Sequence, residues 1–372
     1  MEAAVCYELG KSLVIEEVEL DPPQAGEVQV RVAATAICHS DVHLVRGDWV
    51  NWSSDPPVIA GHEAAGVVEA VGQGVTRTQP GDAVVVSLLR SCGRCFYCTI
   101  GSPFLCEGKF ALATEKRIHD KSGRPINQGI STGAFAESVI VDQSQVVQVP
   151  ADLPLDRACL LACGVVTGWG AVVNTAQVEP GSRVVVIGTG GVGLNAVQGA
   201  ALSGAYPIIA VDIVDKKLAA AQQFGATHTI NAGQQDVSTV VKELTGRRRA
   251  DYVFVTVGSP AAVTQGMGLI RRGGTVVLVG MPKAGATAPI PVGDFVYNGQ
   301  KVIGSNMGSS RLSVDVPRLA ELYQHGRLKL DELITARYPL QRINEAIESM
   351  ERGEALRNVI VFSDSQHGRL PR

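Results

Sequence analysis

The residues best suited to bind a metal are four cysteines within a short stretch. Cys92, Cys95, Cys98 and Cys106 follow the spacing C-x2-C-x2-C-x7-C. A tetrahedral zinc ion takes four soft ligands, and Cys-x-x-Cys turns bring thiolates together at little cost in loop closure. With all four positions filled, the pattern predicts a structural zinc site. The alternative, a disulfide cluster, is disfavoured because the N-terminus lacks the basic and apolar regions of an export signal.

A second set of metal-binding residue types is spread along the chain. Cys38 stands in Cys-His-Ser-Asp-Val-His, His62 in Gly-His-Glu, and Cys163 directly before a glycine. Two thiolates and one imidazole bind zinc and leave a fourth position open, which is what a catalytic zinc requires. Spacing alone does not separate this interpretation from two ordinary buried cysteines.

The third pattern is a glycine-rich turn. Gly188-Thr-Gly190-Gly191-Val192-Gly193 fits G-x-G-x-x-G, follows an apolar run typical of a buried strand and opens a helical segment. In that context the glycines permit a tight turn and a close approach of the backbone to a pyrophosphate. The helix N-terminus then offers N–H groups to the anion. The turn therefore predicts a dinucleotide site.

Asp212 ends the next predicted strand, nineteen residues beyond Gly193. A carboxylate there accepts hydrogen bonds from a ribose diol and repels a 2′-phosphate, so the pattern favours NAD over NADP. Lys217, one helical turn further on, would help to hold the ribose. The alternatives are that Asp212 only caps the following helix and that Lys217 is an ordinary solvated lysine.

Length and composition exclude several other classes of function. The chain has 372 residues, of which 45% are apolar, and a net charge of −3. The length predicts two domains, and the charge gives no reason to expect a nucleic-acid or membrane partner. The uncharged run from Val184 to Val211 imitates a membrane span, but its glycines indicate strand, turn, helix and strand. Eight cysteines without an export signal predict reduced thiols in the cytoplasm.

The hydrophobic patterns predict the elements that position these residues. Residues 1 to about 160 are typical of a barrel-like β-domain, with a period-two strand at 27–34 and glycine-bounded strands at 66–71 and 83–87. From about residue 165 strands alternate with helices, which predicts a doubly wound α/β unit. After about residue 300 the pattern mixes again, with amphipathic helices at 315–325 and 343–353 and a closing strand at 357–362.

With these motifs the chain resembles the zinc-dependent medium-chain alcohol dehydrogenases from about Glu27 to Phe362. The resemblance rests on Gly61-His-Glu-Ala-Ala-Gly-Val-Val, the cysteine cluster, the glycine turn and the Cys163-Gly segment. It implies a GroES-like β-rich catalytic domain interrupted by a Rossmann dinucleotide-binding domain, with the active site in the cleft between them. The domains would span 1–164 (catalytic), 165–300 (NAD-binding) and 301–372 (the return to the catalytic domain).

The resemblance also gives the second set of metal-binding residues a role. Cys38, His62 and Cys163 would bind the catalytic zinc, with Glu63 close behind the metal. Asp41 would hydrogen-bond the free ring nitrogen of His62 and fix its tautomer. Its alternative is a turn cap. Together with the four-cysteine site, the resemblance implies two zinc ions per chain.

Further residues would serve the substrate and the cofactor. Ser40 would contact the substrate hydroxyl and His43 would end a proton relay, although a surface-loop histidine is the alternative for the latter. The implied cofactor contacts are His39 and Arg357 at the pyrophosphate and Thr167 and Val192 behind the nicotinamide ring.

The expected reaction is reversible, zinc-dependent hydride transfer from an alcohol, preferably a primary one, to NAD+. A zinc polyol or secondary-alcohol dehydrogenase, a dehydrogenase of a thiol adduct of formaldehyde, and a zinc-free relative are the alternatives. Trp49, Leu88 and Met281 align with substrate-pocket walls of the family. The segment 107–132 is interpreted as a solvated surface loop in preference to a specificity element. The resemblance implies a homodimer or homotetramer, with the strand at 301–306 pairing across a two-fold axis.

Overall fold

The computed structural model describes residues 1–49 and 55–362. By its internal contacts the chain divides into two units. Unit 1 comprises Met1–Cys163 and Arg311–Arg372, and unit 2 comprises Gly164–Ser310. A β-rich unit is thus interrupted by an α/β unit, in agreement with the predicted fold class.

Unit 1 is built on two sheets that bring distant parts of the chain together. The six-stranded sheet has the order β2-β1-β5-β9-β8-β3, and the larger sheet has the order β11-β7-β6-β4-β19-β18 with β10 paired to β4. The strands of the first are β1 (Glu2–Cys6), β2 (Val14–Glu17), β3 (Glu19–Leu20), β5 (Val58–Ile59), β8 (Ile118–His119) and β9 (Pro125–Gln128). The strands of the second are β4 (Glu27–Ala36), β6 (Glu63–Val71), β7 (Ala83–Val86), β10 (Ser138–Asp142), β11 (Val146–Gln148), β18 (Ile334–Tyr338) and β19 (Arg357–Val361).

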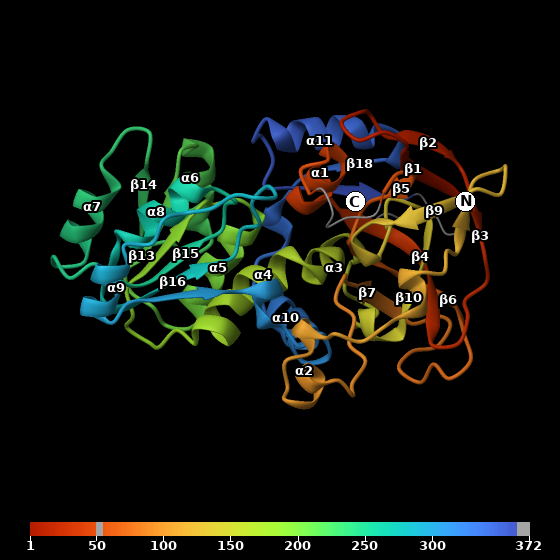
Figure 1. The fold of residues 1–372 in the computed structure, drawn as a ribbon, viewed down its shortest axis with the longest axis horizontal. Helices are drawn as coiled ribbons and strands as arrows, with labels where there is room; N and C mark the ends of the chain where they lie inside the picture. The colour runs from red at the N-terminus through yellow and green to blue at the C-terminus, as the bar shows by residue number, and fades with distance from the viewer. Residues whose placement is uncertain (50–54, 363–372) are drawn as a thin grey trace. The chain divides into compact units, whose positions relative to one another are not determined.

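The C-terminal part of the chain completes unit 1. Strand β19 pairs antiparallel with β4, so the last described strand lies beside one of the first, and Figure 1 shows these blue and red segments together. Ile343, Ile347 and Met350 on one side of a C-terminal helix join the core formed by β1 and β5. The helices of this unit are α1 (His39–Arg46), α2 (Phe96–Thr99), α3 (Leu155–Ala158), α10 (Leu312–Gln324) and α11 (Ile343–Glu351).

Unit 2 contains one six-stranded sheet in which every strand pairing is parallel. Its order, β14-β13-β12-β15-β16-β17, is that of a dinucleotide-binding Rossmann sheet, with the order reversing between β12 and β15. The strands are β12 (Val184–Ile187), β13 (Ile208–Asp212), β14 (His228–Asn231), β15 (Ala250–Val255), β16 (Ile270–Leu278) and β17 (Lys301–Gly304). Several of them are seen in green to cyan in Figure 1.

Helices cover the sheet of unit 2 and explain why its strands are apolar on both faces. All four residues of β12 are buried, which requires a packed layer on either side. Val237, Val241 and Met267 from two of these helices join the core over one face. The helices are α4 (Gly164–Gly170), α5 (Gly191–Leu202), α6 (Asp215–Gln223), α7 (Val237–Leu244), α8 (Pro260–Met267) and α9 (Val292–Asn298).

The uncharged run from Val184 to Val211 forms β12, α5 and most of β13, as predicted. Among the described residues no single helix has the length and apolar character to cross a membrane. The bent pair Leu155–Ala162 and Gly164–Ala176 meets those two criteria only when its halves are taken together.

The predicted return to the catalytic domain at residue 301 is wrong. Lys301–Gly304 forms β17, whose residues pair in register with Thr275–Leu278 of β16. This strand therefore completes the sheet of unit 2, and the chain returns to unit 1 only after Ser310. The first boundary, after Cys163, differs from the predicted one by a single residue.

The segment 107–132 is more than the solvated loop that we predicted. It contributes β8 and β9, and Ile118 and Ile126 are fully buried. The Arg117 guanidinium donates to both carboxylate oxygens of Glu27, at 2.8 and 2.9 Å, and both side chains are buried. Basic residues suggested a solvated face, whereas this arginine anchors the segment to the start of β4.

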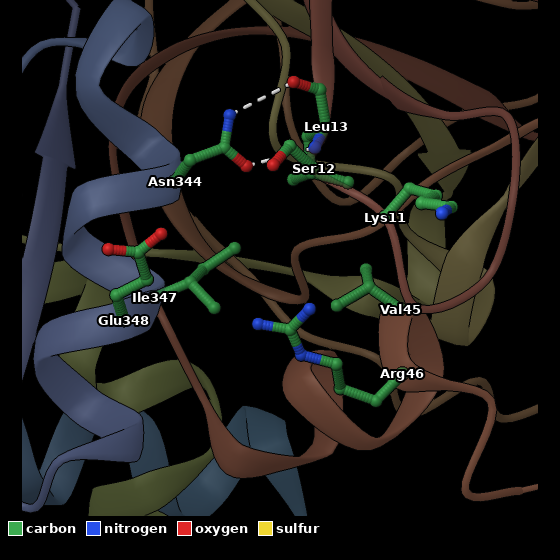
Figure 2. Close-up of a pocket in the computed structure, with 8 residues that line it drawn as sticks. All are labelled: Lys11, Ser12, Leu13, Val45, Arg46, Asn344, Ile347 and Glu348. Atoms are coloured by element: carbon green, nitrogen blue, oxygen red, sulfur yellow. Dashed lines mark hydrogen bonds between the residues drawn. The ribbon is translucent and has the colours of Figure 1, made fainter.

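A hydrogen-bonded clamp joins the N-terminal segment to α11. The Asn344 side chain accepts from Leu13 N–H at 2.9 Å and donates to Leu13 C=O at 3.0 Å, as Figure 2 shows. The small pocket beside it is lined by Lys11, Val45, Arg46 and Glu348, among others. Arg46, one of the lining residues, pairs with Glu351 at 2.7 Å.

Candidate metal and dinucleotide sites

Asp41 organises the buried site in unit 1. It lies in the first turn of α1, and its side chain accepts from Cys38 N–H at 3.0 Å and Gly61 N–H at 2.9 Å. Its Oδ1 also lies 2.9 Å from His62 Nδ1. Because a carboxylate only accepts, the ring nitrogen facing it is the donor, and Nε2 is the nitrogen that remains to bind a metal. The predicted contact between Asp41 and His62 is confirmed.

The four predicted ligand and near-ligand residues converge in unit 1. One ligand atom from each of Cys38, His62, Glu63 and Cys163 lies within 4.8 Å of all the others, and all four residues are buried. His62 Nε2 is buried without a hydrogen-bond partner among the described residues. A hydrogen bond from Cys163, helped by His62 and Arg357, lowers the pKa of Cys38 well below its usual range. An unpartnered imidazole nitrogen beside a stabilised thiolate fits a zinc ion.

Glu63 is held by the C-terminal strand. Its Oε1 accepts from Arg357 Nη2 at 2.9 Å, and Arg357 Nη1 donates to Ile37 C=O at 3.2 Å. Glu63 Oε2 is buried and has no hydrogen-bond partner within the described part of the chain, and burial raises the pKa of this carboxyl to about 8. A cation at the cluster would offset that cost, which again fits a metal.

Arg357 lies in unit 1 behind the cluster. Its side chain is only 4% exposed, and its guanidinium donates to Glu63 and to Ile37 C=O. Burial alone would lower the pKa of this guanidinium, but the charges of Glu63, Cys38 and Cys163 raise it. The predicted pyrophosphate contact of Arg357 stays a prediction, whereas its link to Glu63 was not foreseen.

Ser40 and His43 follow Cys38 on α1. Ser40 is half-buried, and His43 Nδ1 lies 2.8 Å from Asp48 Oδ2. The His43 ring also lies 5.2 Å from the buried Trp49 ring, between centroids. Sequence reasoning missed Asp48, although a carboxylate just beyond the glycine that ends a short helix was a usable signal. This bond uses Nδ1 of the His43 ring, and the predicted proton relay through this histidine stays a prediction.

The four-cysteine segment forms a lobe without a core of its own. The sulfurs of Cys92, Cys95, Cys98 and Cys106 lie within 4.8 Å of one another, and none of the eight cysteines forms a disulfide. Backbone N–H groups point at these sulfurs: Cys92 N to Cys106 Sγ is 3.2 Å and Cys95 N to Cys92 Sγ is 3.3 Å. Backbone hydrogen bonds lower the pKa of Cys95 to about 6. Burial raises the pKa of Cys98 to about 12, so only a bound cation would keep all four sulfurs as thiolates. The convergence of the four sulfurs fits the predicted structural zinc ion.

The glycine turn of unit 2 has the geometry that a pyrophosphate needs. It joins β12 to α5, and Gly190 caps the helix. A Cβ on Gly193 would lie 1.8 Å from Gly188 O, so only glycine allows this close packing. A Cβ on Gly190 would meet nothing within 4 Å, so the backbone there is open to a ligand. The turn therefore fits the dinucleotide phosphates.

Asp212 stands at the carboxyl end of β13, next to that turn. Its Oδ2 accepts from Thr189 N–H at 2.7 Å and from the Thr189 hydroxyl at 3.0 Å. Its Oδ1 accepts from Ile213 N–H at 2.8 Å and Val214 N–H at 3.1 Å. The carboxylate thus caps the turn before α6, as the alternative interpretation required, and also faces the glycine turn, as the ribose-binding interpretation required.

The remaining predicted cofactor residues are distributed over both units. In unit 2, Val192 is the second residue of α5, Lys217 is half-buried on α6, and the Thr167 hydroxyl donates to Met307 Sδ at 3.5 Å. His39, in unit 1, is exposed at the start of α1. Their contacts with a cofactor, and the pocket roles of Trp49, Leu88 and Met281, stay predictions.

Family models match both parts of the chain. A model described as an alcohol dehydrogenase GroES-like domain matches residues 24–151, and one described as a zinc-binding dehydrogenase matches residues 191–324. The first lies in unit 1, whereas the second runs from the glycine turn of unit 2 to the end of α10 in unit 1. These matches agree with the GroES-like and Rossmann parts of the predicted fold.

Relatives match nearly the whole chain. The "NDMA-dependent alcohol dehydrogenase" of Amycolatopsis methanolica is 41% identical and covers 97% of this chain and 99% of its own length. An alcohol dehydrogenase zinc-binding domain protein of Burkholderia ambifaria has a TM-score of 0.92 at 35% identity, covering 98% and 99% of the two chains. The benzyl alcohol dehydrogenase of Acinetobacter calcoaceticus has a TM-score of 0.89 at 34% identity, covering 97% and 99%. These relatives support an alcohol dehydrogenase activity, and the chain belongs to the zinc-dependent medium-chain alcohol dehydrogenase family.

Proposed function

We propose that this protein oxidises a primary alcohol to an aldehyde with NAD+ and zinc, reversibly, in the cytoplasm. The observation that carries the proposal is the buried cluster in which Cys38, Cys163 and the unpartnered Nε2 of His62 converge. Two thiolates and one imidazole make a ligand set that leaves room for a substrate oxygen. The four-cysteine lobe would hold a second, structural zinc ion.

When bound, zinc would supply a Lewis acid that favours the deprotonated alcohol, and NAD+ would accept a hydride. The chain supplies the rest. Asp41 fixes the His62 ring, and Arg357 neutralises Glu63 behind it. Ser40 Oγ would accept the hydroxyl proton of the alcohol while its own proton leaves toward His43, and His43 Nε2 would pass a proton on to solvent while Asp48 holds the ring.

The substrate class and the cofactor class are inferred from one relative and from one carboxylate. The benzyl alcohol dehydrogenase among the relatives supports a primary alcohol. Asp212 beside the glycine turn supports NAD over NADP, because a carboxylate repels a 2′-phosphate. The relative named NDMA-dependent favours a second candidate, in which alcohol oxidation by this protein depends on NDMA rather than on added NAD+.

The test is a panel of straight-chain, aromatic, secondary and polyol alcohols, each assayed with NAD+, NADP+ and NDMA as acceptors. We expect NADH formation with primary alcohols and little turnover with NADP+. Turnover seen only with NDMA would support the second candidate. Turnover confined to polyols or secondary alcohols would contradict the substrate class, and no turnover by protein containing zinc would contradict the proposed reaction.

We also propose that the protein forms a homodimer, alone or within a homotetramer, through the edge of the unit 2 sheet. Strand β17 ends that sheet, and the neighbouring helix α9 exposes Val292, Val296 and Tyr297 at 66%, 79% and 77%. Exposed apolar residues beside an open strand edge are typical of an interface. Light scattering should give two or four chains per particle, and fewer for Val296→Glu. A wild-type protein with the mass of one chain would contradict the proposal.

A further inference from the structure

The carboxylate of Asp212 is held by four donors from its own chain. Thr189 donates to Oδ2 through its N–H and its hydroxyl, and the N–H groups of Ile213 and Val214 donate to Oδ1. Three of these four donors are backbone N–H groups, which remain when the side chain of their own residue is changed. The Thr189 hydroxyl is the only one of the four that a substitution removes.

Thr189 is placed to control the position of this carboxylate. It follows Gly188 directly after β12, and β12 pairs in parallel with β13, which carries Asp212. Its side chain is fully buried, so its hydroxyl is held in place and bonds Asp212 Oδ2 at 3.0 Å. The same residue therefore joins the phosphate-binding turn to the candidate ribose-binding carboxylate.

We propose that Thr189 is a positioning residue that sets the preference for NAD over NADP by fixing the Asp212 carboxylate. This inference rests on the proposed function, in which Asp212 accepts the ribose diol. A carboxylate held by two donors at one oxygen keeps the rotamer that accepts the diol and that repels a 2′-phosphate. With the hydroxyl removed, the side chain gains freedom, so it binds the diol less well and turns away from a phosphate.

The test compares the binding of NADH and NADPH, measured by calorimetry on protein freed of bound nucleotide. Thr189→Val keeps the side-chain shape and removes the hydroxyl. We expect it to raise the Kd for NADH about three- to tenfold and to leave the Kd for NADPH unchanged or lower. Thr189→Ser, which keeps a hydroxyl, should restore much of the NADH affinity.

A second background separates positioning from a change in the shape of the turn. Combined with Asp212→Gly, Thr189→Val should have no further effect on NADH binding, because no carboxylate remains to be positioned. Asp212→Asn serves as the background if the glycine variant is unstable. In that background Thr189→Val should change the logarithm of the Kd for NADH by at most half as much as it does in the wild-type protein. The inference would be overturned if Thr189→Val weakened NADH and NADPH binding equally, or if it weakened NADH binding as much in the Asp212→Gly background as in wild type. Either result would leave the proposed function standing. A wild-type protein that binds neither dinucleotide would overturn the proposed function and this inference with it.

Discussion

Cys38→Ser is expected to lower kcat/KM for the preferred alcohol by roughly a thousandfold or more, because several kcal/mol of transition-state stabilisation depend on the metal. The thiol of Cys38 has a pKa lowered by Cys163 and His62, so it would bind a metal as a thiolate. A serine hydroxyl in the same buried place stays neutral and is a much weaker ligand for zinc. The expected product is a folded protein that has lost the metal of this cluster.

Three measurements on the variant separate this expectation from general damage. Zinc content should fall by one ion per chain, NADH binding should persist, and circular dichroism should be unchanged. Cys159→Ser is the matched control, because Cys159 is equally buried in unit 1 but lies outside both ligand clusters. Its turnover should stay within about threefold of wild type, since it removes no ligand. Wild-type turnover in Cys38→Ser would show that Cys38 does not bind the catalytic metal.

Cys95→Ser in the four-cysteine lobe is expected to lower the stability of the protein and not to act on the catalytic step directly. Neither Phe96–Thr99 nor Pro103–Leu105 buries a residue, and Phe96 is 64% exposed, so the lobe has no apolar core to keep it folded. Structural zinc contributes about 10 kcal/mol or more to the folding of small zinc domains. Loss of one thiolate should therefore unfold the lobe.

The change should appear as loss of one zinc ion, rapid proteolysis between residues 92 and 110, and a thermal midpoint lower by several degrees. Cys6→Ser is the control, because Cys6 lies in the unit 1 core outside either ligand cluster and its change should leave both metals bound. If Cys95→Ser kept its full zinc content and its resistance to proteolysis, the lobe would not be a structural metal site.

The patterns that predicted the fold well are those with a local physical cause. The apolar run at Val184–Ile187 can only be a strand buried on both faces, and the glycines after it allow the turn that Gly193 requires. That Cys38 and His62 lie close together was predicted only from the family resemblance. Their spacing says nothing about which side chains meet, because β4 and β6 pair over a separation that sequence alone does not reveal.

The missed features depend on contacts between distant segments. From the sequence, Arg117 is expected to be solvated. Its burial depends on Glu27, which lies ninety positions earlier in the chain. The unit boundary near residue 301 was missed because β17 resembles the strands on either side of it and is identified only by its pairing with β16. Thr189 gave no signal either, since the x position of a G-x-G-x-x-G turn carries no constraint by itself.

The ion pair between Arg357 and Glu63 has a consequence for the synthesis of the protein. All the candidate ligands of the buried cluster precede Gly164, so they leave the ribosome well before the last strand. Until β19 is made and pairs with β4, the Glu63 carboxyl lacks its cation, and burying it unpaired costs several kcal/mol. Closure of the cluster is therefore coupled to completion of the chain, and a truncated product that ends before residue 357 would not assemble a finished metal centre.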